Sequence, residues 1–473
     1  MTDALVEQKN QALSLAENSV KNLYEKYKNK LEVNPDLDRK IVSFQANKIE
    51  PIFRWFHYRE GFSKQLIEYI LENINIPSGG KILDPFAGTG VAPFVAEKYH
   101  GMDGIAIELM PVGTFFMQCR NEFSKLKNQD LIRYARNALE SRHEWLKTTP
   151  EWEFKHLKIT VGAFSYEDEK ELCQFKTWLT NIEDESNKLF LDFIAFSILE
   201  KFSFTRKDGQ YLRWDHRSPR FLDASKKTTF DKGEVLSFFE ALRRKLEYII
   251  EDLSIEVSEE NKTNDVKILE GSVLKVIDEL EDNSLDAIIT SPPYCNRYDY
   301  TRTYALELAY LGVNEENIRS LRQTLLTCTV ENKPKHFEWL SDEDKHHINQ
   351  AFDKQSDLSN VLTFLDIEAK EGRLNNKGIA TMVRGYFYDS AVHLYQASKK
   401  MKTGGYYVMV NDNVKYNGLE IPVDLILSEI ANEFSLKTEK IWVLPKGKGN
   451  SSQQMKKHGR TELRKCVYIW KKA

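Results

Sequence analysis

The chain of 473 residues is 41% hydrophobic and 29% charged, with a formal net charge of −4 at pH 7. This composition is typical of an ordinary soluble protein that has two or three domains, or one domain with large insertions. No segment approaches the roughly 20 apolar residues of a membrane span, and the net charge alone does not indicate nucleic-acid binding.

No signal-peptide pattern opens the chain, so we expect a cytoplasmic protein. The cysteines and histidines show no paired spacing typical of metal ligands. We therefore expect reduced thiols and no bound metal. The cysteines are Cys119, Cys173, Cys295, Cys328 and Cys466.

Residues 1–45 predict a charged amphipathic helix that breaks at Asn34-Pro35, an N-terminal extension without chemistry of its own. Phe53–Leu71 begins aromatic and basic and then predicts a helix capped by Ser63. The aromatic half, Phe53–Tyr58, fits a core and a ligand-contacting segment equally well.

Lys81–Gly90 reads KILDPFAGTG, which predicts a strand that runs into a glycine-rich turn. A helix and a second strand ending at Glu108 follow, so this is a β-α-β unit with an acid about 20 positions after the loop. Such a unit suits an adenosine ligand, because Gly88 and Gly90 let the backbone approach and the acid can accept the ribose hydroxyls. A dinucleotide is disfavoured, since Pro93 stands where its fingerprint needs a third glycine.

Residues 121–262 predict a mostly helical insertion. Within it, Phe204–Arg220 alternates basic and aromatic side chains around a glycine turn, which suits contacts with a nucleic-acid backbone and stacking on bases. A structural loop with internal salt bridges is the alternative. The candidate nucleic-acid contacts are Arg206, Lys207, Tyr211, Arg213, Trp214 and Arg217.

Val266–Leu274 predicts a third strand, which ends at Gly271 and Ser272. Asp286–Tyr300, DAIITSPPYCNRYDY, then combines a buried strand with two prolines that prevent both a further ladder bond and a helix. The result is a rigid corner at the carboxyl end of a strand, where ligands bind in open α/β sheets. Its oxygen acceptors and aromatic ring could hold a flat amine. The corner residues are Ser291, Pro292, Pro293 and Tyr294.

After the corner, Arg302–Gly312 predicts a helix that packs back onto the sheet, and residues 313–376 predict a second helical insertion. Further strands are expected at Gly378–Val383 and Tyr406–Val410, and a closing hairpin at Lys440–Leu444 and Cys466–Trp470. From Lys437 onward there are eleven Lys and Arg against two Glu. Part of this excess lies in a basic loop, Lys446–Arg464, which fits phosphate contacts or a solvated surface.

DPFAGTG and TSPPY together resemble the cofactor loop and the (Ser/Asn/Asp)-Pro-Pro-(Tyr/Phe) motif of the bacterial DNA amino-methyltransferases. The resemblance implies a class I, Rossmann-like methyltransferase: a doubly wound, mostly parallel sheet of about seven strands with helical insertions. It also implies S-adenosylmethionine as cofactor and double-stranded DNA as partner. The cofactor contacts that it implies are Phe62, Ser63, Asp84, Pro85, Phe86, Gly88, Gly90, Glu108 and Ser272.

On this basis the catalytic domain comprises residues 46–120, 263–312 and 377–473. Residues 1–45 form the extension, and residues 121–262 and 313–376 form the two insertions. The first insertion is the candidate DNA-contact region.

The resemblance further implies methyl transfer to the exocyclic amine of a flipped base, catalysed by the Ser291–Tyr294 corner. Serine before the prolines is most common among enzymes that make N4-methylcytosine, so cytosine N4 is expected and adenine N6 is the alternative. An RNA guanine-N2 methyltransferase is a further alternative, although those enzymes usually carry Asp before the prolines and an N-terminal RNA-binding module. The expected setting is restriction-modification or DNA protection, with a separately encoded restriction endonuclease as a candidate partner.

Overall fold

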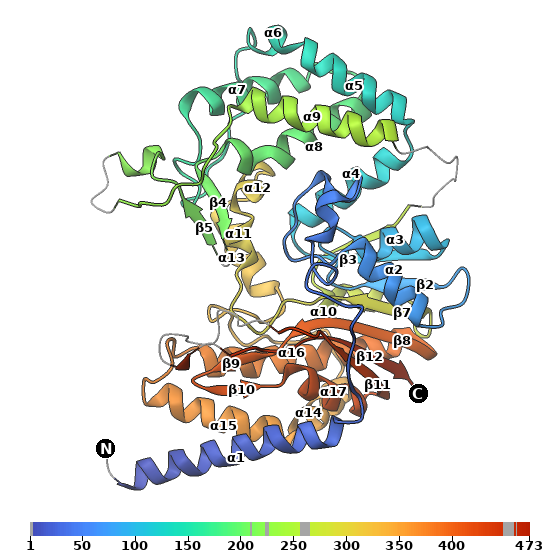
Figure 1. Ribbon diagram of the computed structural model, residues 1–473, viewed down its shortest axis with the longest axis vertical. Helices are drawn as coiled ribbons and strands as arrows, with labels where there is room; N and C mark the ends of the chain where they lie inside the picture. The colour runs from blue at the N-terminus through green and yellow to red at the C-terminus, as the bar shows by residue number, and fades with distance from the viewer. Residues whose placement is uncertain (1–2, 209–210, 223–226, 256–264, 448–457, 460) are drawn as a thin grey trace.

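A central sheet of eight strands organises the molecule (Figure 1). The computed structural model describes residues 3–208, 211–222, 227–255, 265–447, 458–459 and 461–473. In the sheet, neighbouring strands follow the order β1-β11-β12-β8-β7-β2-β3-β6. The strands are β1 (Leu31–Val33), β2 (Lys81–Asp84), β3 (Asp103–Glu108), β6 (Lys267–Glu270), β7 (Leu285–Thr290), β8 (Met401–Asp412), β11 (Leu436–Val443) and β12 (Lys465–Lys472).

Within this sheet only β12 runs against the others, since it is antiparallel to both of its neighbours, β8 and β11. The prediction of an α/β protein with a mostly parallel sheet is confirmed. The expected number of seven strands is wrong, because Leu31 pairs opposite Ile441 and β1 extends the sheet beyond β11. A strand of three residues carries too little alternating pattern to be recognised in a sequence.

Helices cover both faces of the sheet (Figure 1). Alternate strand residues point to opposite faces: Leu83 and Ile288 join the apolar cluster of α16 and α17, whereas Ile82 and Ile289 join that of α2 and α3. The bounds of these helices are α2 (Lys64–Asn73), α3 (Val91–His100), α16 (Ile379–Lys400) and α17 (Val423–Glu433).

The strand predicted at Gly378–Val383 is the beginning of helix α16. Met382, Val383, Tyr386 and Phe387 are all buried at helical spacing. A helix buried on most of its circumference and a buried parallel strand both read as short apolar runs, so the pattern of the run alone could not separate them.

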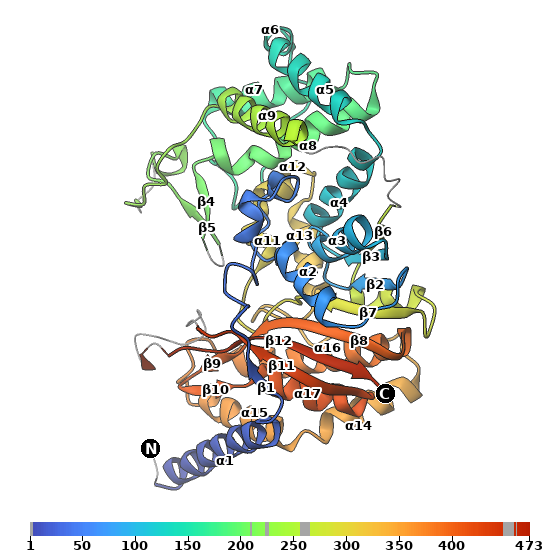
Figure 2. The same ribbon diagram turned by 45° about the vertical axis from the view of Figure 1, so that its right-hand side comes forward.

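A second body of helices with its own apolar core stands above one end of the sheet (Figure 2). Helix α8 packs against α4, α5, α7, α9 and α12. The helix expected to pack back onto the sheet is α12, and it belongs to this second core instead. The elements here are α4 (Pro111–Ser124), α5 (Asn128–Glu140), α6 (Arg142–Trp145), α7 (Tyr166–Leu179), α8 (Glu185–Phe202), α9 (Phe238–Ile255), α11 (Tyr300–Thr303), α12 (Ala305–Tyr310), α13 (Glu315–Thr324) and the hairpin β4 (Thr205–Asp208) and β5 (Tyr211–Trp214).

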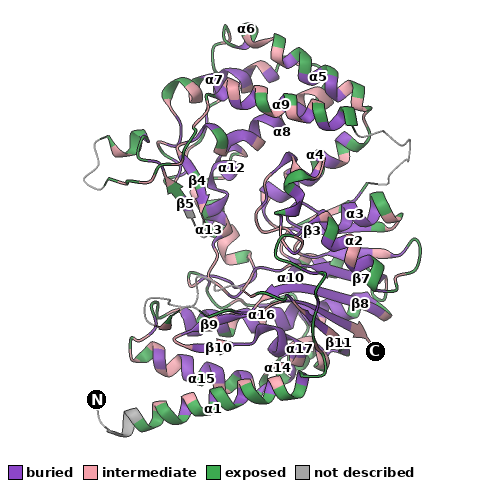
Figure 3. Cartoon of the chain, viewed as in Figure 1, coloured by how far each residue is buried: buried purple, intermediate pink, exposed green. Residues whose placement is uncertain are grey.

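On the other side of the sheet, helix α1 packs along α15 and buries only one stripe of its surface, as Figure 3 shows. Ala16 and Leu23 lie in that stripe, and Ser19 accepts a hydrogen bond from the Asn360 side chain. The remaining elements are α1 (Asp3–Tyr27), α10 (Val273–Val276), α14 (Asp342–Asp353), α15 (Ser356–Lys370), the pair β9 (Val414–Tyr416) and β10 (Leu419–Ile421), and the 3-10 turns η1 (Ala46–Ile49), η2 (Phe53–Trp55), η3 (Pro219–Phe221) and η4 (Ile277–Glu279).

Among the described residues no helix has the length and apolarity needed to cross a membrane. The same residues contain no group of three or more His, Cys, Asp or Glu placed to hold a metal ion. The five cysteines are buried and free.

Candidate active site

The glycine-rich loop after β2 is tied to the acid at the end of β3. The Gly88 N–H donates to Glu108 Oε2 at 2.5 Å, and the Met110 N–H donates to Glu108 Oε1 at 2.7 Å. Gly88 has φ +55°, in the left-handed region that favours glycine. Gly90, with φ +70°, precedes the first residue of α3. The loop therefore turns sharply at the carboxyl end of the sheet.

This loop borders a cavity of about 720 Å³, part of it open to solvent, at the carboxyl ends of β2, β3, β6 and β7. The residues before α2, the loop and the proline corner all contribute to its wall. The lining residues are Tyr58, Glu60, Gly61, Phe62, Asp84, Pro85, Phe86, Ala87, Gly88, Val91, Ile107, Glu108, Leu109, Met110, Gly271, Ser272, Val273, Ser291, Pro293, Tyr300, Leu325 and Leu326.

Carboxylates dominate the polar lining of this cavity. Glu60, Asp84 and Glu108 line it, and no described lining residue is a Lys, Arg or His. Burial raises the pKa of Glu108 to about 7, against the opposing effect of the Met110 and Gly88 N–H donors. Burial likewise raises the pKa of Asp84 to about 7, although the Thr290 hydroxyl, at 2.6 Å, and the Phe86 N–H favour its charged form. The cavity therefore suits a ligand that carries positive charge.

Glu60 is a site residue that was not predicted from the sequence. The Tyr298 and Tyr304 hydroxyls both donate to its carboxylate. Burial raises the pKa of both tyrosines, so they remain neutral donors. Tyr304 also stacks on Tyr58, with ring centroids 4.8 Å apart and planes at 13°. The nearest sequence signal was the aromatic and basic character of Phe53–Tyr58, just before Glu60. That segment fitted a buried core as well as it fitted a ligand-contacting segment.

The proline corner is joined to the glycine loop through the Thr290–Asp84 hydrogen bond, directly before Ser291. The Ser291 and Tyr294 hydroxyl oxygens are 3.1 Å apart. From β12, Lys465 Nζ donates to the Tyr294 hydroxyl at 3.1 Å and lies 3.3 Å from Asp412 Oδ1. Burial opposes the charge of Lys465, but Asp412 and Tyr294 raise its pKa above its usual range, so the ammonium stays charged.

Most of the predicted cofactor and catalytic residues line this one cavity. Ser63 is buried, caps α2 by accepting from the Leu66 N–H, and donates to the Ile41 carbonyl at 2.6 Å. Its hydroxyl is thus used within the fold. Gly90, Pro292 and Tyr294 lie next to lining residues and are absent from the lining itself. The predicted residues in the lining are Phe62, Asp84, Pro85, Phe86, Gly88, Glu108, Ser272, Ser291 and Pro293.

Relatives among curated proteins match almost the whole chain. The Type II methyltransferase M.AvaI of Nostoc sp. is 43% identical over 470 residues, which cover 96% of this chain and 93% of the relative. The M.AvaI of Anabaena variabilis matches equally well. The Type II methyltransferase M.BsoBI of Geobacillus stearothermophilus is 40% identical over 467 residues, covering 94% and 91%. The chain belongs to the Type II methyltransferases.

No family model and no solved structure matches this methyltransferase. The prediction of a methyltransferase is confirmed by the relatives. The glycine loop and the proline corner, which carried that prediction, lie on one cavity in the structure.

The basic segment predicted to contact DNA is divided between the interior and the surface of the methyltransferase. Lys207 is buried, and its ammonium lies 2.5 Å from Glu307 of α12, so it anchors the β4–β5 hairpin to the second core. This environment does not fit a DNA contact. Arg206 and Arg213 face each other across the hairpin and are exposed.

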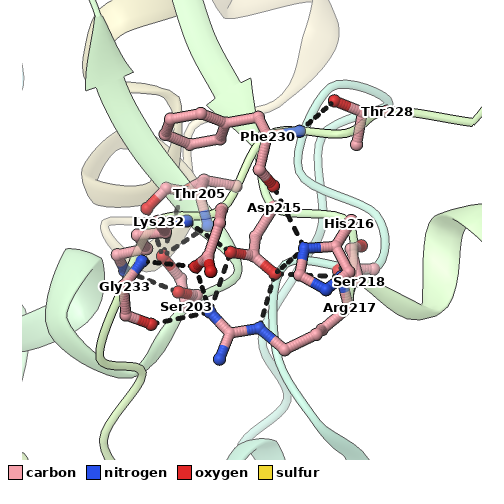
Figure 4. A network of polar contacts seen from close by, with 12 residues as sticks. Ser203, Thr205, Asp215, His216, Arg217, Ser218, Thr228, Phe230, Lys232 and Gly233 are labelled. Carbon is pink, nitrogen blue, oxygen red and sulfur yellow. Dashed lines mark hydrogen bonds and ion pairs between the residues drawn. The ribbon is translucent and has the colours of Figure 1, made fainter.

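Arg217 is held by acceptors of the protein itself, as Figure 4 shows. Its Nε donates to Asp215 Oδ1 at 2.7 Å, its Nη2 donates to Oδ2 at 2.8 Å, and Nη2 also reaches the Gly233 carbonyl at 2.7 Å. Asp215 is buried, and the hydrogen bonds from Arg217 hold its pKa well below the usual range. Arg217 therefore fits the internal salt bridge that was the alternative interpretation.

The other residues of this segment are less constrained. The Arg213 guanidinium lies 4.0 Å from the centre of the Phe230 ring and 3.1 Å from Asp208. Trp214 is half-buried, with the Arg220 guanidinium over its ring. Tyr211 belongs to β5, but its side chain lies outside the described residues, as does most of the basic loop Lys446–Arg464. At the end of that loop, Arg464 turns inward to Asp424 at 2.5 Å.

We expect Arg217→Ala to lower the free energy of unfolding by about 1–3 kcal/mol, because it leaves the Asp215 carboxylate buried with fewer donors. The lower part of that range is expected, since the Arg217 side chain is 41% exposed and solvent weakens the pair. Chemical denaturation measures the change. An unchanged midpoint, compared with Arg206→Ala as a surface control, would refute the structural role.

Proposed function

We propose that this methyltransferase transfers a methyl group from S-adenosylmethionine to the exocyclic amine of a base flipped out of double-stranded DNA, and that the base is cytosine, methylated at N4. One observation carries the proposal: the glycine loop, the acid of β3 and the Ser-Pro-Pro-Tyr corner meet at one cavity, with Thr290 bonded to Asp84 between them. Restriction-modification is the setting that the relatives' class suggests, with DNA as the partner and a separately encoded endonuclease as a candidate second partner.

The residues around the cavity fit the proposed cofactor. Glu108, at the end of β3, would accept the ribose hydroxyls, as the acid does in other nucleoside sites of this β-α-β type. The lining contains three carboxylates and no described cation, which suits the sulfonium and ammonium charges of S-adenosylmethionine. The Glu60 carboxylate is oriented by hydrogen bonds from two tyrosine hydroxyls. S-adenosylmethionine supplies an electrophilic methyl group. Phe62, Pro85, Phe86, Ser272 and the Gly88 backbone supply the remaining walls.

The corner acts on the amine. The lone pair of an exocyclic amine is delocalised into its ring, which makes the nitrogen a poor nucleophile. Ser291 Oγ and the Pro292 carbonyl accept its two hydrogens and draw the lone pair toward the methyl group, while Tyr294 stacks on the base. The N–C bond forms as the S–C bond of the sulfonium breaks, the demethylated cofactor leaves as a thioether, and one proton passes from the nitrogen to solvent. Positioning and hydrogen bonding are the main contributions that we assign to the corner.

Ser291 supports cytosine as the target, because a neutral hydroxyl is smaller than a carboxylate and leaves a differently shaped pocket for the amine. Incubation with labelled cofactor and sheared genomic DNA, followed by digestion to nucleosides and mass spectrometry, tests the proposal. N4-methylcytosine is the expected product. N6-methyladenine alone would overturn the base assignment, and label in transfer RNA without label in DNA would overturn the DNA substrate.

Cofactor affinity should increase with pH through the pKa of Glu108. The carboxylate accepts hydroxyl hydrogens better when it is ionised, and its pKa near 7 keeps it mostly protonated at pH 6. We expect the Kd for S-adenosylmethionine to be about tenfold lower at pH 8 than at pH 6. Isothermal titration calorimetry measures it, and Glu108→Gln should weaken binding and flatten the dependence.

The stability of the ligand-free protein should change with pH in the opposite direction to its cofactor affinity. Because the folded state raises the pKa of Glu108, the ligand-free protein binds more protons than the unfolded chain and loses stability as pH rises from about 4.5 to about 7. Glu108→Gln should therefore unfold at a higher temperature than the wild type at pH 8. A wild-type affinity that falls with pH, or a variant that is less stable at pH 8, would contradict the assignment.

For DNA, the exposed hairpin arginines are the strongest candidates. Arg206 and Arg213 are directly opposed in register, which places two exposed cations side by side, and Asp208 pairs with Arg213 at 3.1 Å. The hairpin also packs against α11, which follows the corner segment. Arg206→Ala together with Arg213→Ala should weaken DNA binding and reduce its salt slope by about two. Fluorescence anisotropy at several salt concentrations measures both, with the exposed Arg384→Ala as control; equal slopes would refute the contact.

A further inference from the structure

The turn that follows the proline corner holds an arginine in an unfavourable backbone conformation. Arg297 has φ +67°, in the left-handed region that side chains other than Asn and Asp rarely adopt. The Asn296 N–H donates to the Tyr294 carbonyl at 2.7 Å and tightens the chain just before it. Such outliers persist where the surrounding structure enforces them, and they cluster at functional sites.

Two tyrosine hydroxyls hold the chain on either side of Arg297. On one side, the Cys295 carbonyl accepts from the Tyr416 hydroxyl at 2.8 Å. On the other, the Tyr298 hydroxyl donates to Glu60 in the cavity wall. The turn therefore lies, along the chain, between the corner, which ends at Tyr294, and the tyrosine that donates to Glu60 of the cavity wall.

Among the residues that the structure describes, no anion pairs with the guanidinium of Arg297. Its Nε is buried without a hydrogen-bond acceptor in the described part of the chain. Its Nη1 donates to Asn375 Oδ1 at 3.3 Å, a neutral acceptor, and no described carboxylate lies within ion-pair distance. In contrast, Arg302 and Arg322 nearby are both paired with Asp299, at 3.1 and 3.0 Å.

We propose that Arg297 binds a phosphate of the DNA strand that carries the flipped base. This inference rests on the proposed function. A nucleotide whose base enters the corner brings its own phosphates to the rim, three residues along the chain from Tyr294. A guanidinium matches phosphate oxygens, and the half-buried Arg297 side chain carries a charge that no described carboxylate neutralises, so its outer nitrogens suit a phosphate. The strained turn holds the Arg297 guanidinium in position before DNA binds.

Two substitutions separate this role from a structural one. Arg297→Gln removes the charge and keeps the strain; Arg297→Gly removes the charge and relieves the strain. With sheared genomic DNA and labelled cofactor, both variants should lower kcat/KM for DNA about tenfold. Both should also reduce by about one the slope of log kcat/KM against log salt. The KM for the cofactor should stay within twofold of the wild type.

Thermal unfolding should distinguish the two variants from each other. Arg297→Gly should raise the midpoint by about 1 °C and Arg297→Gln should not. Ser435→Gly, at φ +63° between α17 and β11, is the matched control, with raised stability and unchanged kinetics. Unchanged kcat/KM and salt slope in both Arg297 variants would overturn the phosphate contact. A wild type that binds cofactor but labels no DNA would instead overturn the proposed function, and this inference with it.

Discussion

Gly88→Ala should weaken binding of S-adenosylmethionine by at least about 100-fold, which corresponds to about 3 kcal/mol. A Cβ at position 88 would lie 2.7 Å from Cε1 of Tyr58, and the φ of +55° disfavours any side chain. Tyr58 cannot easily withdraw, because its ring is buried and stacks on Tyr304. The clash can therefore be relieved only by a shift of the loop, and that shift would pull the Gly88 N–H away from Glu108. Calorimetric titration of the folded variant measures the loss.

Gly101→Ala is the matched control for this prediction. Gly101 has φ +60°, and a Cβ there would meet nothing within 4 Å. The control therefore carries the same backbone penalty, about 1 kcal/mol of stability, without the clash. Cofactor affinity should be unchanged in Gly101→Ala. Normal affinity in Gly88→Ala would show that the cofactor binds elsewhere.

Ser291→Ala should lower kcat for methylation of DNA about 100- to 1000-fold, since the proposed mechanism makes Ser291 Oγ an acceptor for the reacting amine. The Kd for S-adenosylmethionine should change little, because the carboxylates and the glycine loop remain. Single-turnover kinetics with labelled cofactor separate the two quantities. Tyr294→Phe keeps the ring and removes only the hydroxyl that contacts Ser291 and Lys465, so a smaller loss is expected.

Ser284→Ala controls for the loss of a hydroxyl near the same strand. Ser284 is half-buried just before β7 and donates to the Glu281 carbonyl at 2.7 Å, so the variant should methylate normally. If Ser291→Ala kept full kcat, the corner would not handle the amine. If it lost cofactor affinity and kept kcat, Ser291 would belong to the cofactor wall alone.

The two motifs that predicted the site could be recognised in the sequence because each is a short contiguous segment. In DPFAGTG and TSPPY the residue types, their order and the adjoining strand all lie within a few positions of one another. The apolar runs of β2, β3 and β7 likewise predicted the parallel part of the sheet. Their carboxyl ends meet at one edge, so the two motifs were expected to lie together.

Pairings across long distances could not be predicted in the same way. Glu60 meets Tyr298 and Tyr304 across about 240 positions, and no local pattern marks any of the three. Lys207 reads as a surface cation beside other basic residues, and only its distant partner Glu307 explains its burial. Composition shows how many charges a segment carries, whereas the tertiary fold decides which of them meet solvent.

The position of β12 has a consequence for the order in which the enzyme is made. A ribosome produces β8 and β11 before β12, yet β12 lies between them and pairs with both. Until residues 465–472 have emerged, that half of the sheet has a gap that no earlier strand fills, and Lys465 is not yet beside Tyr294. Non-local pairings of this kind form late and slowly. A nascent chain with its glycine loop complete is therefore expected to be inactive, and translation must pass β12 before methyl transfer can begin.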